Sequence, residues 1–269
     1  MKLEVRHITR YQYSAPISET HMEVRLRPSQ EMGQKLAAFE LDLVPESPLR
    51  EYVDGFGNHV HYFDYIPTHE LVEVTSRSEV ETSAPTRHRD DGERPDDFLL
   101  FRDPVTDAPG IRRLAGRHRP ADPDSAASVE AALDELTVGI SRDFQYRPLT
   151  TTVSTAVDEV LRLGSGVCQD FAHLFIAVAR AMGVPARYVS GYVYSGGGLP
   201  SVGASHAWAE AWLPGRGWQG YDATHPVRAG ENHVRIAVGR DYRDAAPTRG
   251  VYVGEARGQL EVRVEVRPL

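Results

Sequence analysis

Cysteine is nearly absent from this sequence, since Cys168 is the only one in 269 residues. A single cysteine cannot form an intramolecular disulfide. Lysine is almost as rare, with only Lys2 and Lys35 among 30 basic residues. No apolar run reaches the roughly 18 residues of a membrane-spanning helix, and the opening stretch MKLEVRHITRYQYS lacks the apolar core of a signal peptide. We therefore predict a cytoplasmic protein that does not bind a membrane.

The chain also lacks an excess of positive charge. Its formal net charge is −8, and acidic and basic residues are interspersed without a dense basic run. Proteins that bind nucleic acid or an anionic membrane surface carry such a run or patch. We therefore predict no nucleic-acid partner. With 41% hydrophobic residues, the chain is long enough for one large domain or two smaller ones.

The first 82 residues have the pattern of antiparallel strands. Apolar and polar residues alternate in LEVRHITRYQY, EVRLR, AAFELDL and LVEVTSRSEVE, and the glycines of DGFGN predict a hairpin turn between two aromatic-rich runs. Residues 83–97 are rich in proline and charge, which is typical of a connecting segment. We predict a β-rich N-terminal domain over residues 1–85 and a second domain over residues 98–269.

The second half mixes helices with strands. Helical spacing of apolar residues begins after Ser125, another helix is expected over residues 154–163, and a largely apolar helix follows GSG and ends at Gly183. Strands are expected in ARYVSGYVY, SHAWAEAWL, GWQGYDA and QLEVRVEVR. The fold class predicted for the whole chain is α+β.

Cys168 stands at the start of the apolar helix, directly after a glycine turn. Unpaired N–H groups and the positive end of the helix dipole favour an anion there, so a thiolate would be stabilised. This placement suits a catalytic nucleophile. The alternative is that the cysteine is a small buried hydrophobe.

His206 and Asp222 are the candidate partners of this thiol. The turn Pro214-Gly215-Arg216-Gly217 predicts a hairpin that places His206 across from residues 222–225. A carboxylate there would accept the imidazole N–H and fix its tautomer, as in nucleophile–base–carboxylate triads. His225 lies in the same window, but chemistry favours Asp222, and we expect His225→Ala to be nearly harmless. Each residue taken alone is equally compatible with a surface or hydrogen-bonding role.

The stretches GSGVCQDFAHLFIAVARAMGVPARYVSGY and SHAWAEAWLPGRGWQGYDAT resemble the core of the transglutaminase-like superfamily, whose papain-like cysteine fold carries Cys, His and Asp in that order. HITRYQYSAPI, RLRPS, DGFGNHVHYF and GRDYRDAAPTRGVYVG are similar to its bacterial branch. The resemblance implies that Cys168 is the nucleophile, His206 the base and Asp222 the orienting carboxylate. In YDATHP, Ala223 replaces the proline of the family's usual Asp-Pro-Thr.

Three further residues are candidates for binding the substrate. Gln145 and Tyr146 lie upstream of the nucleophile in an expected loop, and Trp208 shares the strand parity of His206, as does Trp212. Core packing is the alternative for all of them. The glycine-rich stretch SGGGLPSVG, just before His206, has the composition of a mobile flap.

Asp170 and His173 follow the nucleophile on its helix, where Asp170 is expected to stabilise the helix start. A metal pair of Cys168 and His173 is not expected, because structural zinc sites need four good ligands and no CxxC pair is present. We predict cysteine-dependent acyl transfer on a peptide or protein amide, without a cofactor or metal, most simply hydrolysis through a thioester. Transamidation, as in protein crosslinking, and a non-catalytic peptide-binding module are the alternatives.

Overall fold

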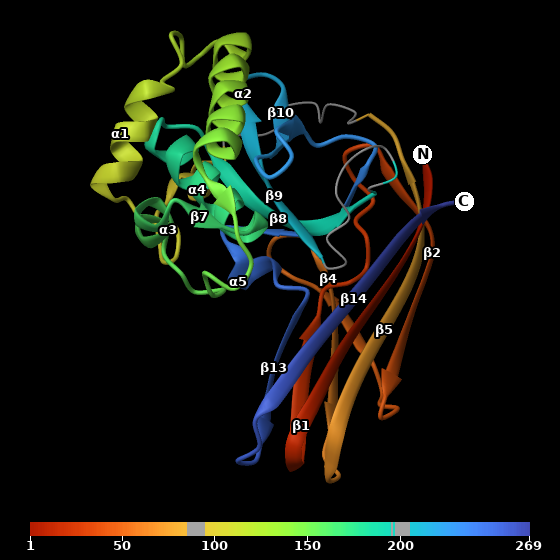
Figure 1. Cartoon of the computed structure of the whole chain (residues 1–269). Helices are drawn as coiled ribbons and strands as arrows, with labels where there is room; N and C mark the ends of the chain where they lie inside the picture. Colours follow the sequence, from red (N-terminus) through yellow and green to blue (C-terminus); the bar gives the residue numbers. More distant parts are fainter. Residues whose placement is uncertain (85–94, 195, 197–204) are drawn as a thin grey trace.

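The computed structural model describes residues 1–84, 95–194, 196 and 205–269. Its larger sheet and its helices flank a second, smaller sheet (Figure 1). The elements follow one another as β1(Lys2–Val24), β2(Gln34–Val44), β3(Arg50–Val53), β4(His59–Tyr65), β5(His69–Thr82), the 3-10 helix Asp96–Leu99, α1(Pro109–Arg117), α2(Ala126–Asp143), β6(Gln145–Tyr146), α3(Val157–Leu163), β7(Ser165–Gly166), α4(Cys168–Ala181), β8(Ala186–Val193), β9(His206–Leu213), β10(Gly217–Asp222), β11(Val227–Arg228), β12(His233–Gly239), α5(Tyr242–Ala245), β13(Thr248–Val253) and β14(Gly258–Pro268).

The larger sheet is built around the long strand β1, and we call it the N-terminal sheet. Its strand order is β2-β5-β1-β4-β3, and β13 and β14 also pair with β1. The first half of β1 lies between β5 and β14, whereas the second half, beyond a register shift after Gln12, lies between β4 and β13. Buried and more exposed residues alternate along β1, as the sequence pattern predicted.

The last two strands return from the second half of the chain to this sheet. Figure 1 shows β13 and β14 beside β1, and the pairing of β14 runs from Leu3↔Pro268 to Tyr13↔Gly258. The predicted division at residues 1–85 and 98–269 therefore does not coincide with the sheets. Alternating residues identify β14 as a strand, but the partner of a strand depends on contacts distant in sequence.

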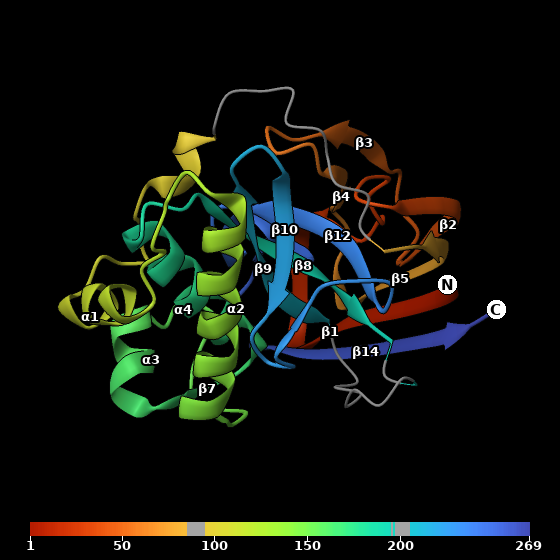
Figure 2. The same cartoon turned by 90° about the horizontal axis from the view of Figure 1, so that it is seen from above.

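The smaller sheet has five antiparallel strands in the order β11-β10-β9-β8-β12, and we call it the core sheet. Helix α4 packs on β8 and β9, and α1, α2 and α3 surround α4. Viewed from above, the helices lie on one side of the core sheet and the N-terminal sheet lies on the other (Figure 2). The predicted α+β fold, with a nucleophile helix on an antiparallel sheet, is confirmed.

Helix α4 is the most deeply buried helix of the fold. Phe171, Leu174, Phe175 and Val178 are at most 2% exposed, and burial of each such side chain contributes about 1.5–3 kcal/mol. The helix ends before Gly183, whose φ of 81° is easy for glycine and costly for other residues. This burial fixes the position of the first turn, where Cys168 lies.

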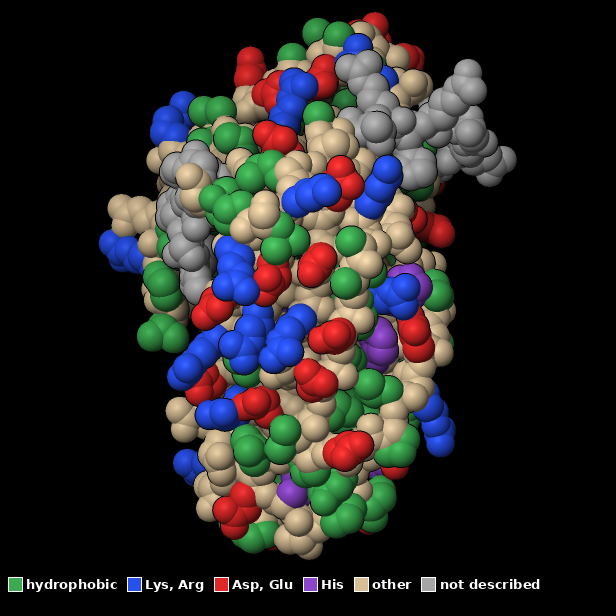
Figure 3. Space-filling view, turned by 90° about the vertical axis from the view of Figure 1, so that its right-hand side faces the viewer, with side chains coloured by type: hydrophobic (Ala, Val, Ile, Leu, Met, Phe, Trp, Pro, Cys, Tyr) green, Lys and Arg blue, Asp and Glu red, His purple; other side chains and the backbone are tan. Residues whose placement is uncertain are grey.

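Acidic and basic side chains are mixed on the surface, as they are along the sequence (Figure 3). On the face that carries β2 and β5, acidic and basic side chains lie next to one another (Figure 3). None of the helices in the described ranges is long and apolar enough to cross a membrane. The predicted cytoplasmic location stays a prediction.

Candidate active site

Cys168 is the first residue of α4 and is half-buried. Asp170, in the same turn, accepts hydrogen bonds from the Val167 N–H at 2.8 Å and from the Thr151 hydroxyl at 2.6 Å. Burial raises the pKa of Asp170, although these two bonds oppose the rise. A Cβ at Gly166 would lie only 2.7 Å from the Asp170 side chain. Because glycine has no Cβ, the segment before Cys168 can pass this close to α4. Asp170 thus stabilises the helix start, as expected.

The hairpin of β9 and β10 brings His206 and Asp222 together. Its register pairs Tyr221 with Ala209, which places the end of β10 near the start of β9. The His206 Nε2 lies 2.8 Å from Asp222 Oδ2, and both side chains are buried. The other ring nitrogen, Nδ1, is buried and has no hydrogen-bond partner of normal geometry among the described residues. The thiol of Cys168 lies close enough to this ring to raise its pKa.

Asp222 accepts hydrogen bonds from two more imidazoles. His225 Nδ1 lies 3.0 Å and His233 Nε2 lies 3.2 Å from Oδ2, the oxygen that also contacts His206. The backbone N–H groups of Thr224 and His225 donate to Oδ1 at 2.9 and 3.2 Å. From the sequence, His225 was expected to be independent of the site, and His233 was not a candidate. Because His225 bonds the candidate triad carboxylate, the structure removes the basis for expecting His225→Ala to be harmless.

The hydrogen bonds determine where the protons of these rings lie. An ionised carboxylate only accepts, so each imidazole nitrogen that contacts Asp222 carries a proton. His233 Nδ1 lies 3.3 Å from the Gly230 N–H and is the acceptor of that bond, which agrees with a proton on its Nε2. His206 likewise donates through Nε2, which leaves Nδ1 as the ring nitrogen that does not contact Asp222.

The electrostatics of the pair favour an ionised carboxylate and a protonated imidazole. Burial alone would raise the pKa of Asp222, but the three histidine hydrogen bonds hold it well below its ordinary value. Burial alone would lower the pKa of His206, but Asp222 and Cys168 raise it to about 10. An imidazolium beside a thiol stabilises the thiolate. The site therefore has the charges needed for a reactive sulfur.

Three of these side chains form the one group within the described parts of the chain that could hold a metal ion. Ligand atoms of His206, Asp222 and His225 lie within 4.8 Å of one another. The nitrogen–oxygen distances of 2.8 and 3.0 Å are those of hydrogen bonds, and a metal would need to replace both bonds to coordinate the nitrogens at about 2.0–2.1 Å. Hydrogen bonding is therefore sufficient to explain the cluster. His173 belongs to another site, where its Nε2 accepts the Tyr242 N–H at 3.1 Å.

Gln145 and Tyr146 lie beside the segment that leads to the nucleophile. They form β6, which pairs in parallel with β7, the two residues Ser165 and Gly166. Gln145 is exposed and Tyr146 is 40% exposed; partial burial, and to a smaller extent the Cys168 charge, raise the pKa of Tyr146 to about 12. The structure thus places both residues beside the segment that precedes Cys168, and substrate contact by them stays a prediction.

The two tryptophans lie in different surroundings. Trp208 is 2% exposed, stacks on His206 with ring centroids 6.2 Å apart and supports that ring from within the protein. Trp212 lines a cavity beside Met182, at the opposite end of α4, about 20 Å from Cys168 at 1.5 Å per helical residue. Substrate contact by Trp208 stays a prediction, with core packing as the alternative. The predicted flap SGGGLPSVG lies almost entirely outside the described residues.

Known proteins share both halves of this architecture. Residues 3–81 match the bacterial transglutaminase-like N-terminal region, and residues 114–223 match the transglutaminase-like superfamily. A protein of Mycobacterium leprae (strain TN), described as uncharacterized, is 34% identical over 291 residues, which cover 100% of this chain and 99% of that protein. The chain belongs to the transglutaminase-like superfamily.

This transglutaminase-like protein is also similar to an enzyme by sequence and to a solved structure by fold. A protein-glutamine gamma-glutamyltransferase of Pseudomonas aeruginosa is 34% identical over 134 residues, which cover 46% of this chain and 19% of that enzyme. The crystal structure of a candidate cysteine protease from Cytophaga hutchinsonii has a TM-score of 0.78 at 24% identity and covers 100% of this chain and 91% of that one. At 24% identity, the similarity to the Cytophaga hutchinsonii structure shows a shared fold. Membership of the superfamily supports cysteine-based acyl transfer on protein or peptide substrates in general.

Proposed function

We propose that this transglutaminase-like protein hydrolyses a peptide or isopeptide-type amide through a thioester on Cys168. The observation that supports this most directly is the orientation of His206, whose Nε2 donates to Asp222 and whose Nδ1 remains available to the thiol. Within this proposal Cys168 is the nucleophile, His206 the acid–base group and Asp222 the carboxylate that orients it.

The thiolate of Cys168 attacks the amide carbon, so that a C–S bond forms and the carbonyl oxygen becomes an oxyanion. Cys168 is the first residue of α4, where backbone N–H groups have no partner within the helix, so its N–H is a suitable donor to this oxyanion. Collapse of the intermediate breaks the C–N bond, and protonated His206 gives its proton to the leaving amine. A water then attacks the thioester while His206 accepts its proton, which releases the acid and the sulfur.

Hydrolysis requires only a path for water to the thioester. Cys168 is half-buried rather than enclosed, and Gln145 and Tyr146 are exposed beside it. These features support the hydrolytic proposal, with Gln145 and Tyr146 as contacts for the substrate. Transamidation is the second candidate, because a relative 34% identical over 134 residues is a protein-glutamine gamma-glutamyltransferase. Both reactions share the thioester and differ in its acceptor.

Product partitioning tests the proposal. The protein is supplied with peptide and isopeptide-type amides as acyl donors and with a rising concentration of a primary amine, and the free acid and the amide product are quantified by mass spectrometry. We expect mostly free acid at millimolar amine. Mostly amide product would favour transamidation and leave the triad intact. Absence of both products and of a Cys168 adduct, across a library of amide donors, would favour a non-catalytic binding module.

A further inference from the structure

Strand β12 lies at the edge of the core sheet, where its one neighbour among the described strands is β8. The outward backbone groups of an edge strand need partners when they are buried. Here the partners come from the N-terminal part of the chain. At Arg235, the backbone N–H and C=O bond to Gln34, and at Val238 they bond to Asn58.

The amide groups of Gln34 and Asn58 act as a neighbouring strand would. The Arg235 N–H donates to Gln34 Oε1 at 2.8 Å, and Gln34 Nε2 donates back to the Arg235 carbonyl at 2.8 Å. Asn58 makes the same pair of bonds with Val238, each also at 2.8 Å. A side-chain amide offers one acceptor and two donor hydrogens in fixed geometry. Each of these amides can therefore bond both the N–H and the C=O of one residue of β12.

Both amides are themselves held in place. Gln34 Nε2 also donates to the Ser29 carbonyl at 2.6 Å, and Asn58 Nδ2 also donates to Asp54 Oδ2 at 3.1 Å. Asp54 and Asn58 belong to the turn DGFGN between β3 and β4, in which Asp54 also accepts the Asn58 N–H at 3.0 Å. The turn predicted from the sequence thus has a second role, because it presents Asn58 to β12.

His233, the first residue of β12, lies between two positions that the N-terminal part of the chain holds, Glu231 just before the strand and Arg235 within it. On one side, the hydroxyl of Thr82 at the end of β5 donates to the Glu231 carbonyl at 2.6 Å. On the other side, Gln34 holds Arg235. His233 between them donates to Asp222.

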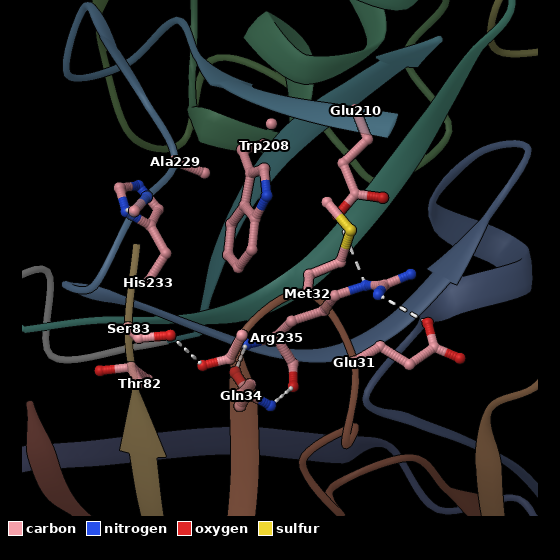
Figure 4. Close-up of a pocket in the computed structure, with 13 residues that line it drawn as sticks. Glu31, Met32, Gln34, Thr82, Ser83, Trp208, Glu210, Ala229, His233 and Arg235 are labelled. Carbon is pink, nitrogen blue, oxygen red and sulfur yellow. Dashed lines mark hydrogen bonds and ion pairs between the residues drawn. The ribbon is translucent and has the colours of Figure 1, made fainter. Parts of the chain in front are cut away.

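The space around His233 leaves it little freedom to move. A cavity of about 40 Å³, lined by Gln34, Trp208, His233 and Arg235 among others, holds no more than a few waters (Figure 4). The ring of His233 meets Trp208 edge-on at 5.2 Å, and Trp208 stacks on His206. The charged side chains that line the same cavity are those of Glu31, Glu210 and Arg235.

We propose that the N-terminal sheet holds the triad in its working geometry: by anchoring β12 on both sides of His233, it fixes His233 against Asp222, and His233 is a positioning residue for acyl transfer. This inference rests on the proposed function of Cys168, His206 and Asp222. His233 is the third imidazole on Asp222 Oδ2, after His206 and His225, and it reaches this oxygen from β12, so it helps to keep the carboxylate oriented toward His206. Loss of that bond removes one of the five hydrogen bonds that orient Asp222 and weakens its hold on His206.

The test uses the rate at which iodoacetamide alkylates Cys168 in the full-length protein at pH 6. Because Cys168 is the only cysteine, the rate reports on this site alone, and no substrate needs to be known. We expect His233→Ala to lower the rate about tenfold, comparable to the loss of one hydrogen bond to a charged group. His233→Gln, whose amide can donate to Asp222, is expected to recover the rate to within about threefold of the wild type.

A double-mutant cycle tests the role of the N-terminal sheet. Gln34→Ala should lower the alkylation rate by itself, and should lower it little further in a His233→Ala background, because both act through β12. Tyr192→Phe is the matched control, since it removes the 2.9 Å hydrogen bond between the Tyr192 hydroxyl and His7 of the N-terminal sheet and keeps the backbone pairing of residue 192 with Val234 of β12.

Each result has one meaning. Wild-type alkylation no faster than that of a free thiol, and unchanged in His206→Ala, would refute the proposed function itself. Fast wild-type alkylation that depends on His206 but is unchanged in His233→Ala and Gln34→Ala would leave the proposed function standing and overturn this inference. If Gln34→Ala fails to fold, Thr82→Val removes the bond to Glu231 with almost no change of shape, and wild-type rates in that variant would overturn the inference equally.

Discussion

Asp222 is a buried carboxylate whose charge is compensated by hydrogen bonds. It has no solvent exposure, and burial of an unpaired charge would cost several kcal/mol. Five N–H groups, three from imidazoles and two from the backbone, donate to its two oxygens. These bonds both maintain the charge and fix the orientation of the carboxylate. The second effect matters for catalysis, because only one orientation offers Oδ2 to His206.

Replacement of Asp222 by asparagine should therefore affect turnover more than folding. The amide has nearly the shape of the carboxylate but the wrong hydrogen-bonding groups, so in Asp222→Asn we expect at least a hundredfold loss of turnover and about 1–3 kcal/mol lower free energy of unfolding. Amide hydrolysis and urea denaturation measure the two effects. Asp134→Asn, at a half-exposed ion pair with Arg228, is the matched control and should change neither by much. Full turnover in Asp222→Asn would contradict the proposed triad.

The sequence predicts the contact between His206 and Asp222, which lie on one hairpin. It does not predict the contact between His233 and Asp222, which depends on the order of strands in the sheet. The turn at Gly215 places Asp222 near His206 by simple counting along two strands. His233 reaches the same carboxylate from β12, which is separated from β10 by β9 and β8 in the sheet order. No periodicity within residues 230–240 indicates that approach.

Helix α4 shows how one element positions the nucleophile. Its apolar residues on most faces predicted a buried helix, and Gly183 predicted its end. Its start depends on Asp170, which holds the Val167 N–H and the Thr151 hydroxyl at once. The close approach of Gly166 to Asp170 makes this arrangement sensitive to a single methyl group.

We expect Gly166→Ala to slow alkylation of Cys168 and to lower the free energy of unfolding by about 1–3 kcal/mol. The added Cβ would lie 2.7 Å from the Cβ of Asp170, so the Asp170 side chain or the backbone must move. Gly116→Ala in α1 is the matched control, because nothing lies within 4 Å of its added Cβ and alanine favours helix. A Gly166→Ala protein with wild-type stability and alkylation would show that α4 does not depend on this contact.

Elements with a strong local pattern were predicted better than those without one. The expected strand of residues 3–13 and the first two residues of the one expected at 23–27 belong to the single strand β1, and the expected helix of residues 154–163 forms as Val157–Leu163. Helix α1 was not predicted, although Pro109 at its first turn and the spacing of Ile111, Leu114 and Ala115 are helical signals. Its proline, two glycines and three arginines weaken the apolar pattern in only 9 residues.

Buried hydrogen bonds join the N-terminal part of the chain to the core sheet. Besides Gln34 and Asn58, His7 of β1 contacts the Tyr192 hydroxyl of β8 at 2.9 Å. The other nitrogen of His7 lies 2.8 Å from the Thr9 hydroxyl. Burial lowers the pKa of His7 to about 4 and, together with smaller effects of neighbouring arginines, lowers that of His173 to about 3. Both histidines therefore stay neutral in the folded protein at pH values where a free histidine is charged.

This difference predicts a loss of stability in mild acid. The unfolded chain binds a proton at each histidine below about pH 6.5, whereas the folded chain does so only near pH 4 and pH 3. The stabilising contribution is thus complete above about pH 6.5. As the pH falls from there toward 4, the free energy of unfolding should decrease, by up to about 1.4 kcal/mol per pH unit for each histidine.

Urea denaturation at several pH values from 7 to 4.5 measures this slope. His7→Gln should reduce the slope by up to one proton, because glutamine does not titrate. Tyr192→Phe removes the same contact between the sheets but keeps His7, so it should lower stability at every pH and retain the slope. An acid limb that is equally steep in His7→Gln and in the wild type would show that His7 is not held neutral by its burial between the two sheets.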